Sequence, residues 1–138
     1  MPNAAKKFVL DTSALFCFKE NEAGADAVEK ILRDVGPRGH VYVSFISFME
    51  FYYILIQEQG ESMARRGYLE LKQLPLHVIE SDEELGLAAG RFKAANKLSL
   101  ADAWVAATAE RLAAILIHKD PEFEALQSLI SLQALPYK

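Results

Sequence analysis

The feature that most constrains the fold of this chain is a regular alternation of short β-rich runs with helical patterns. The β-rich runs lie at residues 7–10, 40–43, 76–79 and 114–117, with a weaker one at 131–134. Between them, apolar residues recur at helical spacing over residues 23–35, 45–59, 62–73, 82–97 and 101–113.

This alternation predicts a parallel sheet, because parallel neighbours need crossover connections and each crossover is usually a helix. We therefore predict an α/β fold in three layers, α/β/α, with a central, mostly parallel sheet of about four to five strands. We expect the strand at 76–79 to be central. In open sheets of this kind, ligands bind beyond the carboxyl ends of the strands, where the strand order reverses.

Composition predicts one domain over residues 1–138, since 51% of the residues are hydrophobic and 25% are charged. A chain of this length buries roughly 68–70% of its unfolded surface, so its core needs neither disulfides nor a structural metal. The sequence has one cysteine, Cys17, which cannot form an internal disulfide. We therefore expect any bound metal to be functional.

Charge and hydropathy exclude two classes of protein. The net charge of -4 argues against the simplest nucleic-acid binders, which are strongly basic. The residues before Asp11 do not resemble a signal peptide. The apolar run at 45–56 contains Glu50 and is far shorter than the roughly 20 residues of a membrane span. We expect a cytoplasmic protein with no membrane association.

Four acidic residues lie where the predicted fold would place a site. Asp11 directly follows the first predicted strand, and Asp120 follows the strand at 114–117 by three residues. Glu50 comes early in the helix after the second strand, and Asp102 early in the helix before the fourth. Parallel strands aim their carboxyl ends the same way, so we expect these acids to converge.

Helix capping is the alternative explanation for each acid taken alone. Ser47 to Glu50 and Ser99 to Asp102 both have capping-box spacing. Asp120 before Pro121 resembles an N-cap, and Asp11 or Thr12 could cap the segment after the first strand. Capping does not predict that the four acids come together.

A convergent group of carboxylates indicates a hard metal ion. Such groups repel one another and raise their pKa values unless a cation neutralises them. Ligation by oxygen alone selects Mg²⁺ or Mn²⁺. Glu50 and Asp102 also stand in helices that are otherwise largely apolar, where a carboxylate needs a partner. A shared metal would satisfy both.

The four acid-bearing segments together resemble the PIN-domain family, and more narrowly its VapC-type toxins. The similar segments are 8–15 with Asp11, 44–50 with Glu50, 99–109 with Asp102, and 117–123 with Asp120 and Phe123. Their order and spacing agree with the family over nearly the whole chain. The resemblance implies a PIN-like fold.

The resemblance also implies a function. VapC-type toxins hydrolyse RNA phosphodiester bonds with Mg²⁺ or Mn²⁺, leaving a 5′-phosphate and a 3′-hydroxyl. The ligand core would be Asp11, Glu50 and Asp102, with Asp120 binding directly or through water, and these four acids would be the catalytic residues. The hydroxyls of Thr12 and Ser13 would hold the geometry of the ligands.

Relatives of this kind form homodimers and are inhibited by a small antitoxin, whose basic side chain often enters the acidic pocket. RNA would need basic groups near that pocket, and the candidates are Lys6, Lys7, Lys19, Arg91, Lys93, Lys97 and Lys119. Glu122 could serve as an outer acid of the site or be a solvated residue.

One residue departs from the family, which usually carries Thr or Ser where this chain has His118. His118 could donate to a phosphate or a carboxylate, or be a bystander. It supports a second hypothesis, a catalytically inactive PIN fold that binds RNA or acts as a scaffold. A phosphoacceptor receiver domain is a third, but receivers place adjacent acids after the first strand, where Asp11 stands alone.

Overall fold

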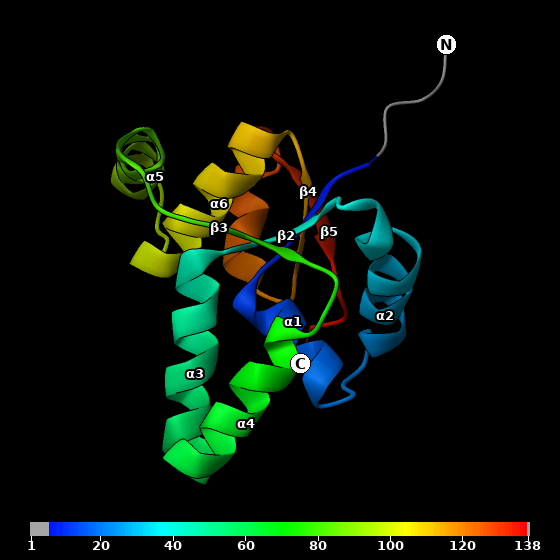
Figure 1. Ribbon diagram of the computed structural model, residues 1–138. Coiled ribbons are helices and arrows are strands. Elements are labelled where there is room, and N and C mark those ends of the chain that lie inside the picture. The colour runs from blue at the N-terminus through cyan, green and yellow to red at the C-terminus, as the bar shows by residue number, and fades with distance from the viewer. Residues whose placement is uncertain (1–5, 138) are drawn as a thin grey trace.

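A computed structural model describes residues 6–137 as a five-stranded, wholly parallel sheet between two layers of helices (Figure 1). The strands are β1 (Phe8–Leu10), β2 (Val41–Ser44), β3 (His77–Ile79), β4 (Ile115–His118) and β5 (Ser131–Ala134), and their order across the sheet is β3-β2-β1-β4-β5. The predicted α/β class and the PIN-like layering are thus confirmed.

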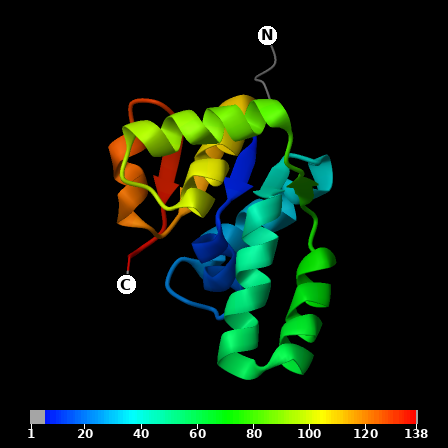
Figure 2. The same cartoon turned by 90° about the vertical axis from the view of Figure 1, so that its left-hand side faces the viewer.

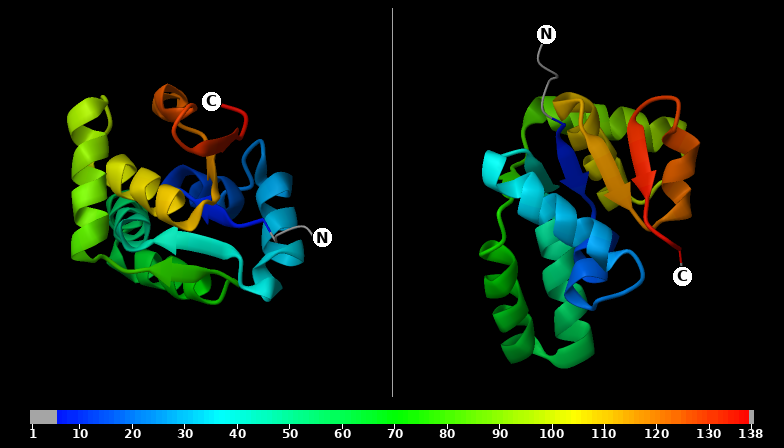
Figure 3. Two further views of the ribbon diagram at one scale, coloured as in Figure 1. Left: turned by 90° about the horizontal axis from the view of Figure 1, so that it is seen from above. Right: turned by 90° about the vertical axis from the view of Figure 1, so that its right-hand side faces the viewer.

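Helices pack on both faces of the sheet. One apolar core is formed with α1 (Thr12–Lys19), α2 (Ala25–Asp34), α3 (Phe45–Gln59) and α4 (Glu61–Lys72). The other is formed with α5 (Glu83–Ala95), α6 (Leu100–Leu112) and the 3₁₀ helix η2 (Pro121–Leu126). Figure 3 shows α2 and α5 on opposite sides of the strands.

The position of β1 at the centre of the sheet follows from its sequence. All three of its residues are buried, as expected for a short apolar strand covered on both faces. Our prediction that the strand at 76–79 is central was wrong, since β3 lies at an edge. Its residues are half-buried or exposed, so an apolar run of this length did not distinguish an edge strand from a central one.

The strand order reverses between β1 and β4, which are neighbours although residues 11–114 separate them in sequence. The chain winds from β1 to β2 and β3 on one side, then crosses to β4 and β5 on the other. A crevice therefore opens at the carboxyl ends of β1 and β4. The α3 and α4 hairpin extends past this edge of the sheet (Figure 2).

Most helices match the sequence prediction to within a few residues, but α1 was not predicted. It has only eight residues, and its apolar residues run together at Phe16, Cys17 and Phe18 instead of marking one face. A short 3₁₀ helix, η1 (Gly36–Arg38), lies between α2 and β2. Within residues 6–137, the helices are too short or too polar to cross a membrane.

Candidate metal centre

Asp11 lies at the junction of β1 and α1 and is almost fully buried, with 3% of its surface exposed. It is the N-cap of α1, and its Oδ1 accepts a hydrogen bond from the Ala14 amide at 2.8 Å. The Ser13 hydroxyl lies 2.8 Å from both carboxylate oxygens. The capping explanation therefore holds for Asp11, but capping alone does not require a charged group at this depth.

Glu50 is not a capping residue. Helix α3 begins at Phe45 and is capped by Ser44, whose hydroxyl accepts from the Ile46 amide, so the capping box we considered from Ser47 to Glu50 does not form. Glu50 instead accepts a hydrogen bond of 2.6 Å from the Thr12 hydroxyl. This hydrogen bond joins α3 to α1. It gives the Glu50 carboxylate a polar partner, which the apolar residues around it in α3 do not provide.

Asp102 and Asp120 each stand near a helix start. Ser99 caps α6 and accepts from the Asp102 amide at 3.0 Å, which leaves the Asp102 carboxylate available for the site. Asp120 is the N-cap of η2 and accepts from the Glu122 amide at 2.9 Å. Both carboxylates are half-buried at the mouth of the crevice.

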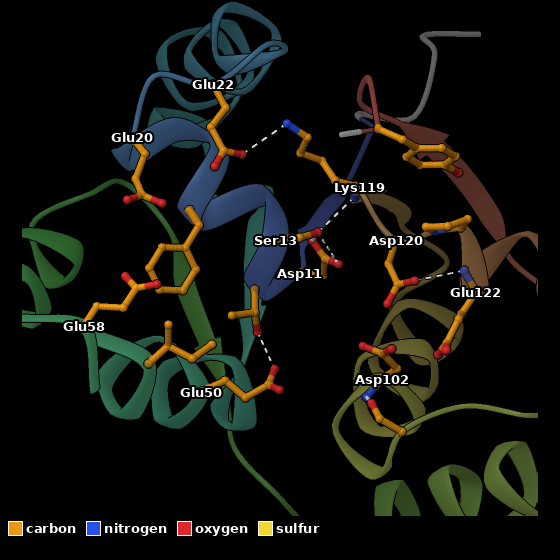
Figure 4. A pocket seen from close by; sticks show the side chains of 16 residues that line it. Asp11, Ser13, Glu20, Glu22, Glu50, Glu58, Asp102, Lys119, Asp120 and Glu122 are labelled. Carbon is orange, nitrogen blue, oxygen red and sulfur yellow. Dashed lines mark hydrogen bonds and ion pairs between the residues drawn. The ribbon is translucent and has the colours of Figure 1, made fainter. Parts of the chain in front are cut away.

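A pocket of about 660 Å³ connects these residues (Figure 4). Its carboxylates are those of Asp11, Glu20, Glu22, Glu50, Glu58, Asp102, Asp120 and Glu122. Among the described residues that line it, Lys119 is the one basic side chain. The structure thus brings all four predicted acids to one strongly acidic pocket.

Burial and mutual repulsion perturb the acids in this pocket. Desolvation raises the pKa of Asp11 to about 7, and the charges of Asp120 and Glu50 add to the rise, although bonds from Ser13 and Ala14 oppose it. The pKa of Asp102 is also raised to about 7, first by desolvation and then by Asp120, Asp11 and Glu50. A divalent cation would relieve both effects.

The oxygen positions fit such a cation. Asp102, Asp120 and Glu122 each offer a carboxylate oxygen, and these atoms lie within 4.8 Å of one another. Hard ions such as Mg²⁺ and Mn²⁺ prefer this donor set. From the sequence we could not choose between an outer acid of the site and a solvated residue for Glu122. In the sequence, the sign that Glu122 belongs to the site was its position two residues after Asp120.

Ser13 and Lys119 fix the position of the Asp11 carboxylate, because Ser13 bonds to Asp11 and Lys119 bonds to Ser13. The Lys119 amide donates to the Ser13 hydroxyl at 2.9 Å, which ties the segment after β4 to the segment after β1. The Lys119 ammonium is largely buried, 3.1 Å from both a Glu22 carboxylate oxygen and the Ala23 carbonyl. Its side chain is therefore occupied in holding the loop after α1 and is not open to a phosphate.

His118 does not face the acidic pocket. It is 1% exposed, and its ring packs edge-on against Phe123, with centroids 5.2 Å apart, and near Tyr137. Burial lowers the pKa of His118, and it is opposed first by a hydrogen bond with the Asp120 backbone and then by the charges of Asp120 and Glu124.

Comparison with known proteins identifies the family. The PIN domain signature matches residues 8–129. No curated protein matches the chain. The fold is similar to that of DNA-bound VapBC from Salmonella typhimurium, with a TM-score of 0.73, 17% identity, and coverage of 94% of this chain and 98% of that one.

Two further structures share the fold. VapBC-1 from nontypeable Haemophilus influenzae is 22% identical with a TM-score of 0.69, and the match covers 92% of this chain and 96% of that one. VapC20 from Mycobacterium tuberculosis, a toxin that cleaves the sarcin-ricin loop, is 16% identical with a TM-score of 0.69, and the match covers 86% of this chain and 94% of that one.

Proposed function

This chain belongs to the PIN domain family, and on that premise we propose that it is a divalent-metal-dependent endoribonuclease, the toxin of a toxin–antitoxin pair. The observation that carries the proposal is the acidic pocket at the reversal of strand order, where Asp11, Glu50, Asp102 and Asp120 come from four separate segments. Two of these acids have raised pKa values that a cation would lower.

The residues that would hold Mg²⁺ or Mn²⁺ are Asp11, Glu50, Asp102 and Asp120, which line one pocket. Asp102 and Asp120, together with Glu122, bring their carboxylate oxygens within 4.8 Å of one another. When bound, the ion supplies activation of a water molecule and stabilisation of charge on the phosphate. The chain's own residues fix the donors in place. Thr12 orients Glu50, and Ser13 orients Asp11.

The negative charge of the pocket also means that a bound cation would help the substrate to bind. A phosphodiester would be repelled by the carboxylates that line the pocket, and the ammonium of Lys119 is already paired with Glu22. Lys93 and Lys97 precede the α6 cap, whose Ser99 lines the pocket, and would supply positive charge on this side of it. The Lys93 ammonium donates to the Leu98 carbonyl beside Ser99.

The partners in this proposal are RNA, a small antitoxin and a second copy of the chain, in the cytoplasm. Solved VapBC structures from other organisms support the antitoxin. The acidic pocket is suited to a basic side chain of such a protein. The second candidate function is an inactive PIN fold that binds RNA or serves as a scaffold; it rests on His118, which is not among the residues that line the acidic pocket.

Cleavage of a single-stranded RNA in Mg²⁺, Mn²⁺ or EDTA tests the proposal. The native protein should cut in either metal, leave 5′-phosphate ends and stop in EDTA. Asp11→Asn should lose at least about 100-fold in rate. Asp26→Asn, an exposed acid in the first turn of α2, is the matched control and should cut normally. Equal cleavage by native protein and Asp11→Asn would disprove the nuclease.

A further inference from the structure

A second cavity, of about 580 Å³, lies beside the metal pocket, between η2 and the sheet strands β4 and β5. The polar side chains in its lining are those of His118, Glu124, Gln127, Ser128, Ser131 and Tyr137. Apart from Glu124, these are neutral groups that donate and accept hydrogen bonds. The lining therefore differs in kind from the many carboxylates of the metal pocket.

His118 lies in the wall of this cavity, and one of its ring nitrogens lacks a hydrogen-bond partner among the described residues. Its Nδ1 is buried and has no hydrogen-bond partner among residues 6–137. The backbone around it is fixed, because the Leu135 amide donates to the His118 carbonyl at 2.7 Å. An unpaired buried nitrogen costs free energy and calls for an explanation such as an absent partner.

Tyr137 joins this cavity to the metal pocket, because its side chain lines both. The tyrosine is 40% exposed, and its ring centroid lies 6.1 Å from that of His118. An exposed aromatic ring is a stacking surface for an unpaired base. The two pockets are thus adjacent, with an aromatic side chain between them.

We propose that the His118 cavity binds the nucleobase next to the phosphate that is cut. This inference rests on the proposed nuclease function and assigns to it a base subsite. The phosphate lies at the carboxylates, one ribose away from a base that stacks on Tyr137. The edge of the base meets the Gln127 amide and the serine hydroxyls, with the buried His118 ring behind them, and these groups together can distinguish one base from another.

Binding of the four uncharged ribonucleosides to metal-free protein tests the subsite without any cleavage. Ring resonances of His118 and Tyr137 in NMR spectra should shift, and one nucleoside should bind more tightly than the others. His118→Leu should weaken that binding about fivefold or more, while His118→Asn, which keeps a polar group near Nδ1, should weaken it less. No shift of either ring with any nucleoside would overturn the proposal.

His40→Leu is the matched control. His40 also has a buried Nδ1 without a partner in the described part of the chain, but it precedes β2 at the amino ends of the parallel strands, whereas His118 lies at the carboxyl end of β4. It should leave nucleoside binding unchanged. Thermal unfolding of each variant shows whether it is folded. If His118→Leu does not fold, Tyr137→Leu against Tyr137→Phe replaces it, and only the leucine variant should weaken binding.

Sequencing of the fragments from a random RNA pool separates this inference from the proposed function. Native protein should prefer one base next to the cleaved bond. Tyr137→Leu should reduce that preference and raise the KM for RNA cleavage. An unchanged preference in Tyr137→Leu would overturn the subsite while leaving the nuclease intact. Nucleoside binding without RNA cleavage would support the subsite as a binding site and refute the nuclease.

Discussion

Asp11 has two roles that act in opposite directions on stability. As the N-cap of α1 it stabilises the helix through the Ala14 amide. As a buried carboxylate near Asp120 and Glu50 it destabilises the metal-free protein whenever it is ionised. Such a conflict is expected where a residue is kept for function.

Asp11→Asn should therefore stabilise the protein while abolishing its activity. Asparagine keeps the cap and removes the buried charge. In EDTA at pH 8, the free energy of unfolding should rise by about 1–2 kcal/mol, as measured by urea denaturation. A less stable variant would show that the charge of Asp11 is already compensated by other groups.

The raised pKa values also predict how stability depends on pH. Between pH 4 and about 7, native Asp11 and Asp102 bind more protons than they do in the unfolded chain. The free energy of unfolding of the metal-free protein should then fall as pH rises through this window, and Asp11 alone contributes at most about 1.4 kcal/mol per pH unit.

Thermal unfolding in EDTA at several pH values measures this dependence. Saturating Mn²⁺ should oppose it, because the ion binds the ionised carboxylates and stabilises the native state more at higher pH. Asp11→Asn should reduce the slope in EDTA. A metal-free protein whose stability rises from pH 5 to 8 would contradict the prediction.

Thr12 should affect the site through Glu50. Thr12→Val keeps the shape of the side chain but removes the hydroxyl that donates to Glu50 at 2.6 Å. Without it the carboxylate loses its orientation, and Mn²⁺ affinity should fall about 10-fold to 100-fold. Thr12→Ser keeps the donor and should bind Mn²⁺ like the native protein in calorimetric titration. Equal affinities for all three proteins would exclude a role for this bond.

At the scale of elements, helix starts set the position of the acids. Ser44 caps α3, which puts Glu50 about one turn further into the helix than a cap at Ser47 would. Both serines lie in the same run of the sequence, and spacing alone did not show which one caps. The strand β2 ends at Ser44, so the chain must turn into the helix there.

The Ser99 cap of α6 should affect both the stability of the protein and its metal site. Ser99→Ala removes the acceptor of the Asp102 amide and should cost about 1 kcal/mol of stability. Because Asp102 lies in this first turn, Mn²⁺ affinity should fall as well. Ser99→Asp restores a capping oxygen and should recover stability in urea denaturation. Unchanged stability in Ser99→Ala would mean that the cap is not needed.

At the scale of the whole molecule, much of the fold could be predicted from the sequence. Strand and helix alternation was sufficient for the α/β class, and the runs at 131–134 and 45–59 match β5 and α3 residue for residue. Strand order was not predictable in the same way, as β3 shows, because it depends on which faces the crossover helices cover. Helix α1 lacked a periodic pattern.

The site was predictable only in part. Asp11 and Asp120 follow neighbouring strands, so their proximity follows from the topology. The proximity of Glu122 to Asp102 depends on the short 3₁₀ turn after Asp120, which sequence periodicity does not show. The direction of the His118 side chain and its contact with Tyr137 likewise depend on β4 and β5 pairing.

Above all, we propose that the acidic pocket holds a divalent cation. Crystals soaked in Mn²⁺ at pH 8, above the raised pKa values of Asp11 and Asp102, allow the ion to be located by its anomalous scattering. We predict an anomalous peak among the carboxylates of Asp11, Asp102, Asp120 and Glu122, and its loss in Asp11→Asn. A map with no peak among these carboxylates, in native crystals soaked to saturation, would contradict the account.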